Sequence, residues 1–304
     1  MLDFNCINTE EIKELVSICN IHPYKLTTID KNFLKKHKVY ISMSTNPIRL
    51  IKIPSILNLL DLTNIYEIHI NLPKYYRNNK NEIYNKNDID FIKKIDSKIK
   101  VFTIEKDIGP LTKIIPTIKR VNDNNAIIIS IDDDIGYPYD MVSKLIHYSV
   151  KKPKQILCGA GFSTNDYPNS DFNRKLLPNK KLPKYPLIDI VEGWGAVAYK
   201  KSIVSEKIIK QIMKLNDIST ECKLSDDFTI SYILAENGIK CSEVPGIREN
   251  LIPLEYGEGE DALHKGSGVK KSGSEDENME KYHKCLDDIS KSRHNRRSKK
   301  KTKI

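Results

Sequence analysis

Three consecutive aspartates, Asp132 to Asp134, are the residues of this sequence whose types and spacing best suit chemistry. They follow the apolar run Ile127–Ile131, whose β-branched residues predict a strand buried on both faces of a sheet. Unpaired carboxylates are costly inside a core, so we expect them at the carboxyl edge of the sheet, where open α/β folds bind ligands. Clustered carboxylates there favour a hard divalent cation, Mn2+ or Mg2+. The alternative interpretation is a solvated acidic turn that caps a helix.

A second acidic pair, Asp226 and Asp227, follows Ser225 at the predicted start of a helix. Acidic residues are favoured at a helix start by the helix dipole and by the free backbone amides. Simple capping is therefore the alternative to a catalytic role for either aspartate.

Two basic residues, Arg49 and Lys113, lie near predicted strand ends and are candidates for contacts with phosphate groups. The Gly109-Pro110 turn before Lys113 suits a close approach of the backbone to a ligand. In a lysine-rich chain, Lys113 has a second interpretation as an ordinary solvated side chain. Arg49 has a second interpretation as the partner of a local carboxylate.

Strands that alternate with helices over 39–158 are typical of right-handed βαβ units. The sequence therefore predicts an α/β fold, wound around a mostly parallel central sheet. We expect strands over 39–43, 66–72, 101–104, 127–131, 155–158, 191–199 and 239–244. We expect helices over 9–19, 54–62, 88–95, 138–148, 202–215, 225–237 and 277–286, and one that ends at 121.

We divide the chain into three parts. Residues 1–36 form a helical N-terminal extension, and residues 37–288 form the wound domain. Within that domain the nucleotide half covers about 37–158 and the acceptor half about 159–288. Residues 289–304 form a basic, disordered tail.

The net charge of +10 comes mainly from the C-terminal end, because residues 290–304 hold eight Lys and Arg and no acid. Without them the charge is 10 − 8 = +2, so the folded body is not typical of a nucleic-acid-binding domain. The tail has the charge to contact an anionic surface, RNA or an acidic protein, and the alternative is a solubilising end.

Six cysteines are scattered singly through the chain, which predicts reduced thiols. The first residues have no signal-peptide pattern, and no apolar run is long enough for a transmembrane segment. We therefore expect a cytoplasmic protein, or one of the host cytoplasm if the source is a virus.

An ordered series of motifs resembles the GT-A glycosyltransferases, the DxD-containing nucleotide-sugar enzymes. The likeness is strongest to uncharacterised members from large-genome DNA viruses and bacterial polysaccharide loci, and it covers about residues 38–265. The matching pieces are Thr45-Asn46-Pro47-Ile48-Arg49, Gly109-Pro110-Leu111-Thr112-Lys113, the aspartate triplet, Tyr137-Pro138, Glu192-Gly193-Trp194-Gly195-Ala196 and Ser225-Asp226-Asp227.

The resemblance implies a metal-dependent glycosyltransferase, a hexosyltransferase by type, that uses a UDP- or GDP-linked donor. The acceptor would be a hydroxyl of a glycan, a protein or a lipid. Asp134 would bind Mn2+ or Mg2+ directly, and Asp132 would contact the metal through water or the ribose. Asp133 would serve instead if the backbone turned at Ile131. His264 would be a late metal ligand, and it has the alternative of an incidental exposed histidine.

The remaining implied roles concern the donor and the acceptor. Arg49 and Lys113 would contact the nucleotide or its phosphates. Asp227, in preference to Asp226, would be the general base of an inverting enzyme, whereas a retaining enzyme would need no such base. Trp194 would stack on a sugar face and Glu192 would bind acceptor hydroxyls, with a core aromatic as the alternative for Trp194. The glycine-rich stretch 257–273 would suit a lid.

Two other classes fit the same residues. A nucleotidyltransferase acting on a sugar phosphate also pairs carboxylates with a nucleotide, but usually has a glycine-rich loop after its first strand, and Ser44-Thr45-Asn46-Pro47 contains no glycine. A non-catalytic GT-A-like scaffold, docked through its basic tail, is the third class.

Overall fold

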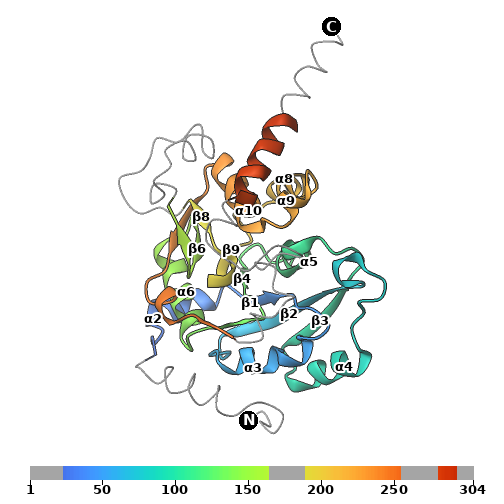
Figure 1. Cartoon of the computed structure of the whole chain (residues 1–304). Coiled ribbons are helices and arrows are strands. Elements are labelled where there is room, and N and C mark those ends of the chain that lie inside the picture. The colour runs from blue at the N-terminus through green and yellow to red at the C-terminus, as the bar shows by residue number, and fades with distance from the viewer. Residues whose placement is uncertain (1–22, 164–188, 255–279, 293–304) are drawn as a thin grey trace.

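A central sheet of seven strands organises the protein (Figure 1). The computed structural model describes residues 23–163, 189–254 and 280–292. The strand order is β10-β6-β9-β4-β1-β2-β3. The strands are β1 (Val39–Met43), β2 (Ile65–Pro73), β3 (Ile99–Ile104), β4 (Ile127–Ser130), β6 (Gln155–Cys158), β9 (Val197–Lys200) and β10 (Lys240–Glu243).

All neighbours in the sheet are parallel except at β9, which is antiparallel to both β4 and β6. The expected class, a wound α/β domain with a mostly parallel central sheet, is therefore confirmed. Two short antiparallel pairs lie outside it: β5 (Ile135–Gly136) with β11 (Ile252–Pro253), and β7 (Gly161–Phe162) with β8 (Ile190–Val191).

Helices cover both faces of the sheet. Successive strand residues point to opposite sides, so a strand with apolar residues at successive positions contributes to a core on each face. On β4, Ile127 and Ile129 pack in one core with α3 (Ile53–Asn58), α4 (Lys86–Ile95) and α6 (Met141–Lys151). Ile128 packs in a second core on the other face. That core contains side chains of α5 (Ile115–Arg120), α8 (Glu206–Asn216), α9 (Thr220–Lys223), α10 (Asp226–Glu236) and a helix over 280–292. In Figure 1 the two groups of helices lie on opposite sides of the sheet.

Short 3-10 turns carry several residues that the sequence placed in strands or longer helices. The helix expected over 54–62 is α3, preceded by η1 (Leu50–Lys52), and the helix expected to end at 121 is split into η3 (Gly109–Lys113) and α5. The strand expected over 191–199 is β8, then η5 (Gly193–Gly195), then β9. Ala196 interrupts it because its φ is +65°, a value outside the strand region. The other turns are η2 (Tyr76–Asn78) and η6 (Arg248–Asn250).

The described part of the segment that we expected to be an N-terminal extension contains α2 (Thr28–Leu34). Thr27 and Asp30 form a capping box at its start, and the buried Asp30 carboxylate also lies 3.1 Å from Nδ1 of His147 on α6. The helix expected over 9–19 lies outside the described residues.

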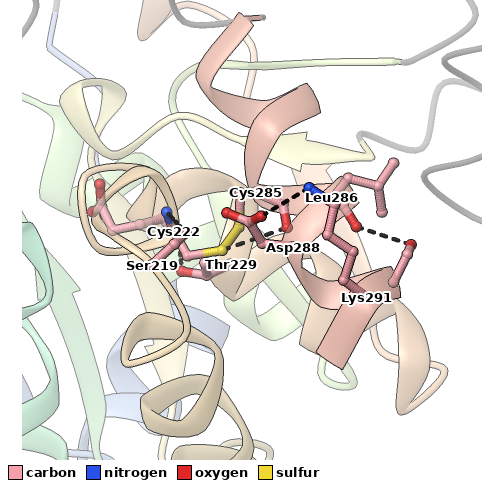
Figure 2. Close-up of a disulfide and its surroundings, with 9 residues drawn as sticks. Ser219, Cys222, Thr229, Cys285, Leu286, Asp288 and Lys291 are labelled. Carbon is pink, nitrogen blue, oxygen red and sulfur yellow. Dashed lines mark hydrogen bonds and ion pairs between the residues drawn. A yellow bond between two sulfur atoms is a disulfide. The ribbon is translucent and has the colours of Figure 1, made fainter. Parts of the chain in front are cut away.

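A disulfide joins Cys222 of α9 to Cys285, across 63 residues of sequence (Figure 2). The expectation that all six cysteines are reduced thiols is therefore wrong for this pair. The packing of the helices brings the two cysteines together. The spacing of the cysteines along the sequence gives no indication of this pairing. Cys158 and Cys241 are free and buried, while Cys6 and Cys19 lie outside the described residues.

The helix over 280–292 is part of the folded body, since Tyr282, Cys285, Leu286 and Ile289 are buried in the second core. It runs four residues past the boundary expected at 288. Tyr282 stacks on Phe228 of α10 with ring centroids 5.5 Å apart. Within the described ranges, no helix combines the length and apolar character needed to span a membrane.

Replacing both cysteines in Cys222→Ser/Cys285→Ser should lower the free energy of unfolding by about 2–4 kcal/mol, because the cross-link restricts the unfolded chain. Urea denaturation with and without a phosphine reductant measures this change. The reductant should weaken the wild type to the level of the double variant and leave the variant unchanged. Equal stabilities of the wild type before and after verified reduction would contradict the prediction.

Candidate active site

The candidate site lies at the point where the strand order reverses. From β1 the chain moves outward through β2 and β3, and then returns to β4 on the other side of β1. The carboxyl ends of β1 and β4 therefore meet at a switch point, the usual ligand-binding position of open α/β sheets. The loop after β1 carries Thr45 to Arg49, and the turn after β4 carries Asp132 to Asp134.

Arg49 binds two of the three aspartates. Its Nη1 lies 3.1 Å from Oδ1 of Asp133 and 2.9 Å from Oδ2 of Asp134. Thr45 donates its hydroxyl to Asp133 over 2.5 Å, and the Asn46 side chain accepts the Arg49 backbone N–H over 2.8 Å. The loop after β1 is thus tied to the aspartate triplet by charge and hydrogen bonds.

Lys113 binds the remaining aspartate of the triplet and connects it to the second acidic pair. Its Nζ lies 2.8 Å from Oδ1 of Asp132 and 3.5 Å from Oδ2 of Asp226. The side chain is buried, and these carboxylates together with Asp227 hold its pKa well above the ordinary value against the effect of burial. The hydroxyl of Ser42 on β1 donates to the Lys113 carbonyl, which fixes the end of η3 against the sheet.

Asp226 and Asp227 occupy the first turn of α10, as expected from the sequence. Ser225 is the N-cap residue, but its side chain makes no capping hydrogen bond. Asp227 instead accepts the backbone N–H of Gly193 over 2.9 Å, so it links α10 to η5. Burial, followed by the charge of Asp226, raises the pKa of Asp227 well above its usual range.

The triplet does not continue the strand. Because β4 ends at Ser130, strand alternation does not decide how Asp132 to Asp134 are arranged. The backbone turns instead: the N–H of Asp132 donates to the Tyr137 hydroxyl over 2.8 Å, and the carbonyl of Asp134 accepts from Leu254 over 2.9 Å. The three carboxylates divide between two basic partners, Lys113 for the first and Arg49 for the other two.

Negative charge exceeds positive charge in this buried region. Five carboxylates, those of the triplet and of Asp226 and Asp227, surround the two basic side chains of Lys113 and Arg49. Burial, with the charges of Asp132 and Asp133, raises the pKa of Asp134 to about 7. Oδ2 of Asp226 is buried without a hydrogen-bond partner in the described structure.

A divalent cation fits these residues by charge and by ligand type, since carboxylate oxygens are the ligands of hard ions. Among the residues that the structure describes, however, no group of three or more His, Cys, Asp or Glu side chains is already gathered for a metal. His264, a predicted ligand, and the stretch 257–273 lie outside those residues.

Glu192 and Trp194 lie beside the site, on the segment between β8 and β9. Glu192 is paired with Arg248, with Oε2 and Nη2 2.6 Å apart, and the Trp194 ring is half-buried against the first core. The glycines that flank Trp194 are closely packed. A Cβ at Gly193 would lie 2.4 Å from Nζ of Lys113, and one at Gly195 would lie 2.4 Å from the Ala160 nitrogen.

Sequence reasoning gave no role to several residues that build this site. Thr45, Gly193 and Tyr137 were inside the quoted motifs, and their presence there was the available signal. Ser42 and Arg248 had no signal at all, because their contacts join segments 71 and 56 residues apart.

No protein-family model matches the chain, and no match was found among curated proteins. Solved structures of similar fold include the following two. One is the crystal structure of GalNAc-T7 with UDP, GalNAc and Mn2+ (13% identity, TM-score 0.48, covering 82% of this chain and 47% of that one). The other is 4-diphosphocytidyl-2C-methyl-D-erythritol synthase from Anaerococcus prevotii DSM 20548 (11% identity, TM-score 0.42, covering 83% of this chain and 97% of that one).

The chain spans about half the length of GalNAc-T7. At these identities and TM-scores both likenesses concern the fold alone. An activity has to be argued from the side chains of the site.

The raised pKa of Asp134 predicts a pH-dependent stability in the metal-free protein. Its pKa is about 7 in the folded state against an ordinary 3.8, so the folded protein keeps a proton that the unfolded chain releases. The free energy of unfolding should therefore fall as pH rises from 3.8 to about 7. Asp134→Asn should flatten this decline and be more stable than the wild type at about pH 8.

Urea denaturation of chelator-treated protein across this pH range measures the effect. Glu105→Gln is the matched control, because that carboxylate is 86% exposed, and it should keep the wild-type slope. A wild-type protein that gains stability over this range, or an Asp134→Asn variant with the same slope, would contradict the prediction.

Proposed function

We propose that this protein is a metal-dependent glycosyltransferase that moves a sugar from a nucleotide-sugar donor to an acceptor hydroxyl. One observation carries the proposal: Lys113 lies between Asp132 of the triplet and Asp226 of the second acidic pair, at the switch point of the sheet. The acidic cluster of the donor side and the acidic pair at the start of α10 therefore meet around the ammonium group of Lys113.

On the donor side, Asp134 and Asp132 would hold a divalent ion, Mn2+ or Mg2+. When bound, the ion supplies charge that stabilises the departing diphosphate. Arg49 and Lys113 would contact the same phosphates, and each lies within 3.1 Å of a triplet carboxylate. Their present partners are carboxylates, so binding of a diphosphate would exchange one anion for another.

On the acceptor side, Asp227 is the candidate general base. Burial and the charge of Asp226 raise its pKa, which makes the carboxylate a stronger base than an ordinary aspartate, and the Gly193 N–H holds one carboxylate oxygen in place. The hydroxyl oxygen would then attack the anomeric carbon as the bond to the diphosphate breaks. Trp194 and Glu192 would position the acceptor, with Arg248 holding the Glu192 carboxylate.

A nucleotidyltransferase acting on a sugar phosphate is the second candidate. It would use the same carboxylates, but it usually needs room for phosphates in a glycine-rich loop after the first strand. Here that loop contains no glycine, and its Arg49 side chain is only 10% exposed between two aspartates. This packing favours the glycosyltransferase.

Calorimetric titration tests the donor side. UDP, GDP and CMP are titrated into chelator-treated protein with and without Mn2+. We expect one nucleotide to bind in the presence of Mn2+, and its affinity to fall about tenfold or more in Asp134→Ala, which removes a metal ligand. Asp217→Ala, at an exposed position after α8, should bind like the wild type. Failure of all three nucleotides to bind would overturn the donor assignment.

Substitution of the candidate base tests the acceptor side. Asp227→Asn should leave nucleotide affinity within a few-fold of the wild type but lower kcat by about 10²–10⁴, the usual contribution of a general base. Release of nucleoside diphosphate from a panel of UDP- and GDP-sugars, with mixed sugar acceptors, measures kcat. Wild-type turnover in Asp227→Asn would exclude this residue as the base and leave either Asp226 as the base or a retaining reaction that needs none.

A further inference from the structure

Tyr137 is a buried residue beside the site that the proposed transfer does not use. Its side chain is 1% exposed, although it carries a polar hydroxyl. That hydroxyl accepts the backbone N–H of Asp132 over 2.8 Å and donates to the backbone carbonyl of Trp194 over 3.0 Å. One phenol thus joins the aspartate triplet to the tryptophan segment, and Trp194 lies 57 residues after Tyr137 in the chain.

Both ends of this bridge are held by other contacts. On the triplet side, Tyr137 follows β5, which pairs with β11, and Leu254 after β11 donates to the Asp134 carbonyl. On the tryptophan side, Asp227 accepts the Gly193 N–H, and Gly195 packs closely on Ala160. The phenol therefore links two backbone segments that are each also in contact with other parts of the structure.

We propose that Tyr137 is a positioning residue that couples the donor side of the site to the acceptor side. A ligand that shifts Asp132 changes the hydrogen bond at the Tyr137 hydroxyl, which is shielded from solvent. The same hydroxyl holds the Trp194 carbonyl, so the shift reaches the segment that carries the Trp194 ring. The position of the Trp194 segment thereby depends on whether a ligand occupies the donor side. The coupling rests on the proposed function, whereas the positioning of Trp194 does not.

Tyr137→Phe tests the positioning without any ligand. It removes only the hydroxyl, and Trp194 is the sole tryptophan, so intrinsic fluorescence reports on this segment alone. We expect a shifted emission maximum and an increase of about twofold in the acrylamide quenching constant, because the Trp194 carbonyl loses its hydrogen-bond donor. Tyr40→Phe is the matched control. It removes a phenol hydroxyl from a residue that is 6% exposed on β1, and it should leave Trp194 fluorescence unchanged.

Titration with Mn2+ and UDP, or with GDP if calorimetry selects it, tests the coupling. In the wild type, nucleotide binding should change Trp194 fluorescence. In Tyr137→Phe, calorimetry should still detect binding, but the fluorescence response should fall to less than about a quarter of the wild-type response. The acceptor KM should rise more than the donor KM, whereas a general loss of structure would lower kcat and thermal stability together.

The outcomes separate this inference from the proposed function. Unchanged emission and quenching in folded Tyr137→Phe would overturn the positioning role, whether or not a nucleotide binds. Nucleotide binding to the wild type with no change in Trp194 fluorescence would overturn the coupling, even if the variant fails to fold. Absence of nucleotide binding to the wild type would instead overturn the proposed function and the coupling with it, while the ligand-free fluorescence would still decide the positioning.

Discussion

The ammonium group of Lys113 is the interaction on which the rest of the site depends. It places one positive charge between Asp132 and Asp226, carboxylates that come from opposite sides of the site. Without that charge, the Asp132 and Asp226 carboxylates, whose side chains are only 26% and 10% exposed, would face each other with only partial compensation, which is unfavourable. Gly193 is required for the same reason, because any side chain at that position would displace the ammonium.

The candidate site keeps more carboxylates than basic partners. Arg49 balances part of the charge of Asp133 and Asp134, but the pKa of Asp134 is still raised to about 7. A buried excess of carboxylates is a cost to the folded protein that a bound cation would remove. The backbone tolerates this excess because its turns are tied down independently, by Tyr137, Leu254 and the hydroxyl of Ser42.

Much of the fold followed from local pattern. The apolar run before the triplet, the strand over 39–43 and the helix start at Ser225-Asp226-Asp227 were predicted from side-chain type and spacing, and the structure has each of them. The segment 191–199 was not predicted correctly. Its apolar residues resemble a strand, but Ala196 takes a φ of +65° so that the turn can pack under Lys113, and local propensity cannot indicate such packing.

The sequence by itself determined the α/β class, the position of the acidic residues at strand and helix ends, and hence the region of the candidate site. Those features depend on periodicity and on the cost of burying charge, which act over a few residues. Only the tertiary structure decided the partners: Arg49 with Asp133 and Asp134, Lys113 with Asp132 and Asp226, and Cys222 with Cys285. Each pair joins distant segments, and its geometry is fixed by the packing of the sheet and helices between them.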